Sequence, residues 1–173
     1  LVELTLVSEN LTSIGAQVFD GASLKKLTIK APKLKTVGTS AFNGNSQMEV
    51  NAEDIIPPSL ISIGINAFKS CKKIAGKISL PNISGTLNEA AFHSCIGITE
   101  IEIVNEKLTA IGNTAFYGCT SCTNITLNCP NLTSIGSLAF SSHYTNSSTN
   151  LKKLNCNCPK VTTFSNQAFF GNA

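Results

Sequence analysis

One phrase recurs along this chain at a nearly constant spacing. It reads LTSIGAQVFDGA from Leu11, LISIGINAFKSC from Leu60, LTAIGNTAFYGC from Leu108 and LTSIGSLAFSSH from Leu132. Aligned on their aromatic residue, the copies are separated by 23, 26, 24, 24, 24 and 29 positions. The aligned residues are Phe19, Phe42, Phe68, Phe92, Phe116, Phe140 and Phe169. A period of this length predicts a solenoid, in which each unit buries its apolar face against its neighbours.

The other half of each unit has the alternation of a short β-strand. Segments that begin at Leu24, Ile98, Cys122 and Leu151 fit the pattern L-x-x-L-x-L. The last two apolar residues of the pattern are two positions apart, so they face the same way. The third copy, MEVNAEDIIPPSL, has two extra residues, and the fourth, IAGKISLPNIS, is shifted by one. The pattern therefore does not place the third strand.

Together the units read LxxIxLxxxxLxxIGxxAFxxC and resemble the BspA-type, or Treponema-type, leucine-rich repeat over essentially the whole chain. We expect an α/β repeat solenoid, a leucine-rich-repeat right-handed superhelix with a parallel sheet on one face and short helices or turns on the other. We expect one domain, 1–173, of about seven repeats within a longer protein. The expected repeats are 1–23, 24–47, 48–73, 74–97, 98–121, 122–150 and 151–173.

Composition and motifs exclude several classes of function. Only 13% of the residues are charged, the net charge is +3, and every positive side chain is Lys. Sequence-specific nucleic-acid readers depend on Arg for bidentate contacts, so no nucleic-acid partner is expected. No apolar run approaches the roughly 20 residues of a membrane span. No nucleophile elbow, phosphate-binding loop or zinc-protease motif is present, so we predict no enzyme activity and no cofactor.

The seven cysteines follow the repeat more than they follow any reactive motif. Cys71, Cys95 and Cys119 each lie three residues after the aligned Phe, where other copies have Asn45 and Asn172. We therefore expect buried, unligated side chains and no metal site. Two alternatives stay open: zinc or redox chemistry at Cys119-x-x-Cys122 with Cys156-x-Cys158, and a Cys129–Cys158 disulfide.

Candidate binding residues are those that packing does not need. The outward positions of the strands carry short polar and charged side chains without an aromatic platform for sugars, and among them we select Lys26, Lys30, Glu100 and Glu102. The two carboxylates could also ligate calcium, although two solvated side chains are the simpler interpretation. The polar insertion SSHYTNSSTN supplies His143 and Tyr144 as a second choice, since recognition often lies on loops.

The function that the family resemblance implies is binding. Such repeats occur on surface and secreted proteins of host-associated bacteria and of some parasitic protists, where they are implicated in adhesion. We therefore expect a cell-surface or secreted module that binds a protein or another extracellular macromolecule. The alternatives are a structural spacer that displays another domain and a glycan-binding module. Asn-x-Ser/Thr sequons at Asn10, Asn82, Asn124, Asn131 and Asn146 would be glycosylated only in a secreted eukaryotic protein.

Overall fold

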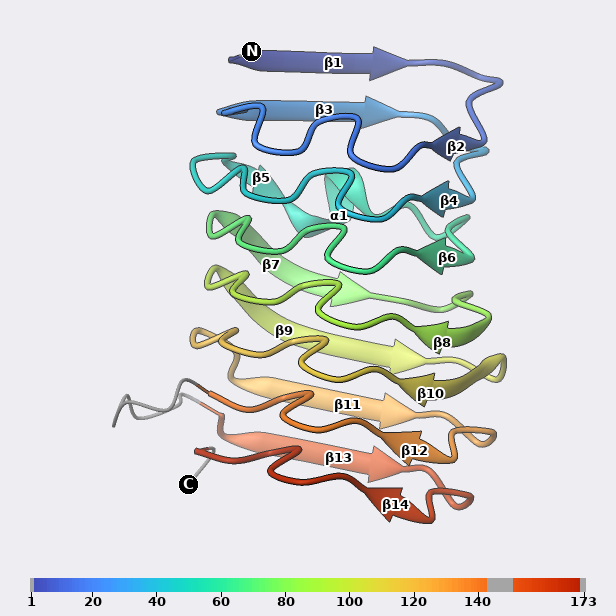
Figure 1. The fold of residues 1–173 in the computed structure, drawn as a ribbon. Helices are drawn as coiled ribbons and strands as arrows, with labels where there is room; N and C mark the ends of the chain where they lie inside the picture. The colour runs from blue at the N-terminus through green and yellow to red at the C-terminus, as the bar shows by residue number, and fades with distance from the viewer. Residues whose placement is uncertain (1, 143–150, 172–173) are drawn as a thin grey trace.

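The computed structural model of the chain describes residues 2–142 and 151–171. The chain winds into one stack of coils, each with one long and one short strand (Figure 1). The long strands are β1 (Glu3–Val7), β3 (Lys26–Lys30), β5 (Val50–Asn51), β7 (Ile74–Ser79), β9 (Ile98–Val104), β11 (Asn124–Asn128) and β13 (Lys153–Asn157). The short strands are β2 (Ser13–Ile14), β4 (Thr36–Val37), β6 (Ser62–Ile63), β8 (Gly85–Leu87), β10 (Leu108–Ile111), β12 (Ser134–Ile135) and β14 (Thr163–Phe164).

The predicted parallel sheet is confirmed. Strands β5, β7, β9, β11 and β13 form one sheet in chain order, and β1 pairs with β3. A single parallel bridge between Lys26 and Glu49 joins these two parts. The short strands form a second layer of parallel pairs, with β2–β4–β6 in one group and β8–β10–β12–β14 in the other. Each inward side chain therefore meets its counterpart in the next coil.

The third coil departs from the others where the sequence has two extra residues. Its long strand is reduced to the two residues of β5, and the chain continues directly into α1 (Ala52–Ile55). Ala52 and Ile55 are fully buried, so the helix fills the core position that a longer strand would occupy. This replacement explains why the strand pattern could not be found in the sequence.

Of the short helices or turns expected opposite the sheet, the helices are not confirmed, because over the described residues that face consists of turns. α1 is the only α-helix among the described residues, and it follows a long strand. Around each aligned Phe, the residue two positions earlier has φ between 51° and 57°, in the left-handed region that ends a right-handed helix. These residues are Gln17, Ser40, Asn66, Ala90, Thr114, Leu138 and Gln167.

Hydrogen bonds between coils explain this zigzag backbone. The N–H of Ser40 donates to the carbonyl of Ile65 in the next coil at 2.8 Å, and Phe42 donates to Ala67 at 2.8 Å. The intervening Ala41 instead donates within its own coil, to Gly38 at 3.2 Å. Alternate N–H groups therefore point along the solenoid axis, which a helix does not permit. The same pattern repeats from coil to coil.

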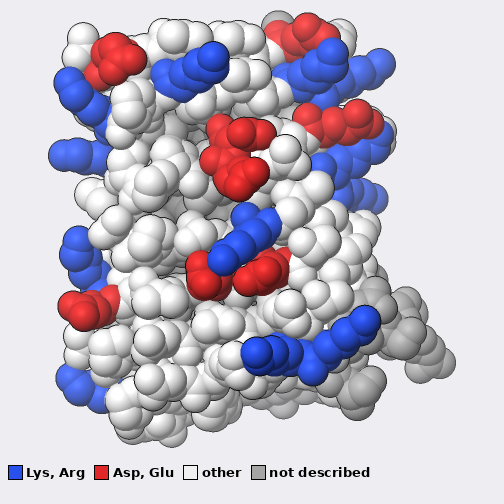
Figure 2. Space-filling model, turned by 180° about the vertical axis from the view of Figure 1, so that it is seen from behind, with Lys and Arg blue, Asp and Glu red and all other residues white. Residues whose placement is uncertain are grey.

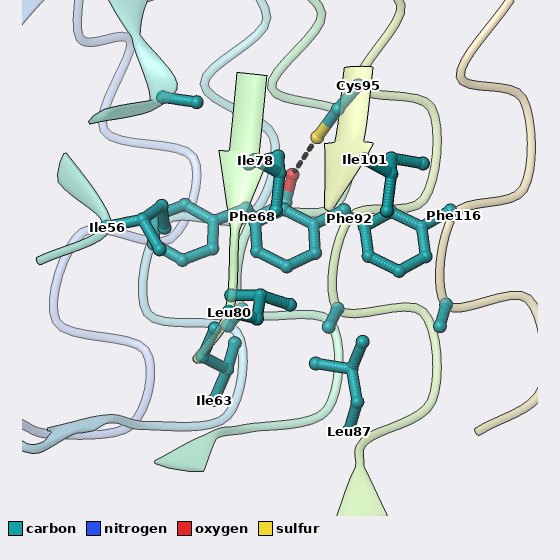
Figure 3. Close-up of a cluster of buried hydrophobic side chains, with 14 of the residues drawn as sticks. Ile56, Ile63, Phe68, Ile78, Leu80, Leu87, Phe92, Cys95, Ile101 and Phe116 are labelled. Carbon is teal, nitrogen blue, oxygen red and sulfur yellow. Dashed lines mark hydrogen bonds between the residues drawn. The ribbon is translucent and has the colours of Figure 1, made fainter. Parts of the chain in front are cut away.

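The core is a column of stacked Phe rings flanked by aliphatic side chains. Consecutive aligned rings lie 5.1–5.4 Å apart between centroids, with interplanar angles of 3–21°. Figure 3 shows Phe68, Phe92 and Phe116 side by side, with Ile78 and Ile101 of the long strands against them. The recurrent phrase is therefore a packing element, as its periodicity predicted.

A second column satisfies the backbone of the turns, as predicted for its Asn and Cys residues. The buried Asn45 side chain accepts from the N–H of Leu24 at 2.9 Å and donates to the carbonyls of Phe19 and Phe42 at 2.8 Å each. In the following coils the thiols of Cys71 and Cys95 each donate to the Phe carbonyl of the preceding coil, at 3.0 and 3.1 Å. Cys119 does the same at 3.4 Å. Asn172 lies outside the described residues.

Candidate interaction surface

The outward side of the long strands, here called the sheet face, is an extended surface that packing leaves available. On β3, Leu27 and Ile29 are buried whereas Lys26, Thr28 and Lys30 are exposed, which is the alternation expected from the sequence. Figure 2 views the molecule from this side: charged side chains are few and are separated by broad uncharged areas. The surface suits contacts of mixed polarity and does not provide a strong field of one sign.

The four sheet-face residues selected from the sequence fall into two places. Lys26 and Lys30 lie on β3, while Glu100 and Glu102 lie on β9, and the strands β5 and β7 separate the two pairs. The structure therefore does not bring them together in one site.

The second choice, His143 and Tyr144, lies outside the described residues, as does the sequon at Asn146.

Ion pairs within the protein already engage most of the selected charges. Lys26 pairs with Glu3 of the neighbouring strand at 3.2 Å. One coil further, Lys73 pairs with Glu49 at 2.6 Å, and the hydrogen bond from Lys73 together with its charge lowers the pKa of Glu49. These residues form a row of alternating charge across the first coils. Exposed pairs of this kind contribute little to stability.

The two carboxylates on β9 share one lysine. Lys77 on β7 lies 2.8 Å from Glu102 and 3.6 Å from Glu100. The hydrogen bond to Glu102, which outweighs the opposing effect of burial, raises the pKa of Lys77. A cationic side chain therefore stands where a calcium ion would need to bind. Over 2–142 and 151–171 no group of three or more His, Cys, Asp or Glu residues is arranged to hold a metal.

Lys30 differs from the other three selected residues. It is exposed at the end of β3 and forms no ion pair among the described residues. Its register partner on β1 is Val7, which is also exposed, so a charged and an apolar residue occupy neighbouring positions at this end of the sheet face. Of the charges selected from the sequence, this is the one that a ligand could contact without first breaking an ion pair.

Two hollows flank α1 on the sheet face, and sequence reasoning missed both. One, of about 500 Å³, is open and includes Lys26, Thr28, Asn51, Asp54 and Lys73 in its lining. The other, of about 260 Å³, lies on the opposite side of the helix. Its lining includes Glu53, Ile56, Pro58, Lys77 and Ser79.

The sequence did carry a signal for these hollows. Both arise because β5 is short and α1 replaces the rest of the strand, and the two extra residues with Pro57 and Pro58 mark that interruption. The signal locates an irregular coil, but it does not say that the irregularity hollows the sheet face.

The cysteines give no metal or redox centre of the kind left open at Cys119-x-x-Cys122. Cys119 points into the Asn and Cys column, and the Cys122 thiol donates to the carbonyl of Asn124 at 3.4 Å. Burial raises the pKa of Cys122 to about 11, so this thiol is protonated at neutral pH. The redox-active thiol of a C-x-x-C site instead has a lowered pKa.

Parallel strands, stacked Phe rings and an Asn and Cys column define a leucine-rich repeat protein. The model of the BspA type leucine rich repeat region matches residues 1–55 and 48–173 in six copies, and the chain belongs to this family. No curated protein matches the chain. No helix within the described ranges is long and apolar enough to cross a membrane.

Two solved leucine-rich repeat proteins are similar to the chain. One, from Bacteroides ovatus, is 20% identical over 96% of this chain and 57% of its own, with a TM-score of 0.42. The other, from T. pallidum, is 16% identical over 90% of this chain and 69% of its own, with a TM-score of 0.42. The chain thus spans a little over half of the first of these proteins.

Proposed function

We propose that the chain is a non-catalytic module, at the cell surface or secreted, that binds a partner macromolecule through the sheet face. The observation that carries the proposal is that inward and outward residues of each coil have different roles. Inward residues and the turn columns are occupied by packing and backbone hydrogen bonds, whereas the outward residues of the long strands support neither. Solenoids use such extended faces for recognition.

Membership of the leucine-rich repeat family supports a protein as the partner, because such repeats serve as interaction modules. The two hollows beside α1 make the sheet face uneven, and a side chain of a partner can insert into them. The partner could be a host protein, and it could equally be another surface protein of the same cell. Surface location rests on the family alone.

A paired charge reversal tests the sheet face. We expect Lys30→Glu combined with Glu102→Lys to weaken capture of proteins from a cell-surface or extracellular-matrix fraction, and the loss to shrink as salt rises. The matched control is Lys33→Glu with Glu106→Lys, which changes the same residue types at exposed positions outside the strands. Circular dichroism checks that both variants fold.

The outcomes separate the alternatives. Equal capture by both double variants would place binding elsewhere on the molecule. Failure of the unaltered chain to capture any component would favour the spacer. Binding to a glycan array by the unaltered chain, without protein capture, would favour the glycan-binding module, for which the sheet face offers no aromatic platform.

A further inference from the structure

Two cysteines occupy equivalent positions directly after neighbouring long strands. Cys129 directly follows β11 and Cys158 directly follows β13. The preceding residues, Asn128 and Asn157, are register partners, and the N–H of Cys129 donates to the carbonyl of Asn157 at 3.2 Å. The ladder of the sheet therefore continues through this pair. Neighbouring strands lie about 4.8 Å apart, within the Cα separation of roughly 4.4–6.8 Å that disulfides adopt.

The two thiols also point in the same direction. The Cys129 thiol donates to the carbonyl of Ile103 at 3.3 Å, and the Cys158 thiol faces the carbonyl of Leu127 at 3.8 Å. Ile103 and Leu127 are themselves register partners, so the two cysteines make the same contact one coil apart. Burial, followed by the charge and hydrogen bonding of the Cys158 thiol, raises the pKa of Cys129 to about 12.

We propose that Cys129 and Cys158 are a disulfide-forming pair that fastens the last described coil to the one before it. The oxidant is a small-molecule disulfide such as oxidised glutathione. The Cys158 thiolate attacks one sulfur of the oxidant and releases the first glutathione thiol. The Cys129 thiolate then attacks Sγ of Cys158 and releases the second. The two protons lost by the cysteines are carried by the two glutathione molecules, which take up the electron pair.

Access to solvent distinguishes this pair from the other stacked cysteines. Cys71 and Cys95 also lie one coil apart in one column, but both are fully buried and no oxidant reaches them. Cys158 is partly exposed, so it can form the mixed disulfide that buried Cys129 then resolves. Cys156 is exposed but lies two residues from Cys158 along one strand. That spacing is about 6.6 Å, near the upper limit for a disulfide.

Peptide mapping without reduction tests the assignment. After equilibration of the purified chain with oxidised and reduced glutathione, we expect one cross-linked peptide pair, joining Cys129 to Cys158. Cys158→Ser should abolish it, whereas Cys156→Ser and the buried control Cys95→Ser should retain it. Cys129→Ser would change a buried residue and therefore also test folding. The cross-link is for this reason removed through Cys158→Ser, at a partly exposed position. Absence of the cross-link, or a Cys156–Cys158 bridge in its place, would overturn the proposal.

Two further readouts follow from the chemistry. The closing step needs the Cys129 thiolate, whose fraction rises about tenfold per pH unit below its pKa. The rate of closure should therefore rise steeply with pH. The oxidised chain should melt roughly 5–10 °C above the reduced chain, and Cys158→Ser should show no such difference. Equal melting temperatures for the two redox forms of the unaltered chain would overturn the fastening role.

Discussion

At the scale of single residues, the contribution of a side chain to the free energy of unfolding depends on whether described coils pack against it on both sides or on one. Phe116 is 1% exposed and its ring lies 5.3 Å from the rings of both Phe92 and Phe140. Phe164 is 57% exposed, and Phe169, at 6.1 Å, is its one ring neighbour among the described residues. Two residues of the same type therefore have very different surroundings.

We predict that Phe116→Ala lowers the free energy of unfolding by about 3–5 kcal/mol, because it leaves a cavity between two stacked rings. Phe164→Ala should cost about 1 kcal/mol or less, as expected for an exposed position. Chemical denaturation of both variants gives the comparison. Similar losses for the two would mean that the Phe column contributes no more than exposed apolar contacts do.

At the scale of the element, the Gly that directly follows the short strand in five of the coils sets how closely two coils approach. A Cβ on Gly64 would lie 2.4 Å from the backbone nitrogen of Thr39 and 2.6 Å from the carbonyl carbon of Gly38. A Cβ on Gly15, in the first coil, would meet only a methyl group of Val18 at 3.4 Å. The need for glycine at Gly64 therefore comes from the backbone of the preceding coil, a contact that no described residue makes at Gly15.

We predict that Gly64→Ala destabilises the chain by roughly 1–3 kcal/mol, since two backbones must separate to admit the methyl group. The same change at Gly15 should alter stability by about 0.5 kcal/mol or less. Thermal unfolding followed by circular dichroism measures both. If Gly15→Ala proved as costly as Gly64→Ala, the contact between coils would not be the cause.

The elements also show which parts of the fold could be predicted from the sequence. The spacing of Phe and the alternation after Leu24 predicted the coils and the inward columns, because burial fixes those residues. The family resemblance implied the parallel sheet. The sequence predicted short helices or turns but could not choose between them, because the left-handed positions carry ordinary residues such as Ser40, Thr114 and Leu138. Hydrogen bonds from the next coil impose that conformation, and a single repeat does not contain them.

The candidate site was predicted only in part, for a related reason. Outward orientation follows from alternation, so Lys26, Lys30, Glu100 and Glu102 were predicted to face away from the core, and they do. Which charges meet depends on register between coils, and register brought Lys77 to both glutamates. Prediction of the hollows beside α1 also requires the arrangement of neighbouring coils, because an interrupted strand leaves a depression only where the strands beside it remain extended.

At the scale of the whole molecule, each coil contacts only the coils next to it, so stability should be distributed unevenly along the stack. Strand β9 lies between β7 and β11, and its inward Ile98, Ile101 and Ile103 are at most 1% exposed. Within the part of the chain that the structure describes, strand β13 has a single neighbour, β11, and all five of its residues are exposed. Opening the last described coil therefore uncovers one interface, whereas opening a central coil uncovers two.

We predict that backbone hydrogen exchange of the reduced chain is fastest in β13 and slowest in β9, because local opening samples the least costly interface first. Mass spectrometry of peptides that cover the two strands measures the difference. Oxidation of the Cys129–Cys158 pair should slow exchange in β13 and leave β9 nearly unchanged, and Cys158→Ser should remove that effect. Uniform exchange along the stack would instead indicate all-or-none unfolding, in which interfaces between coils are strong enough to couple every coil to the others.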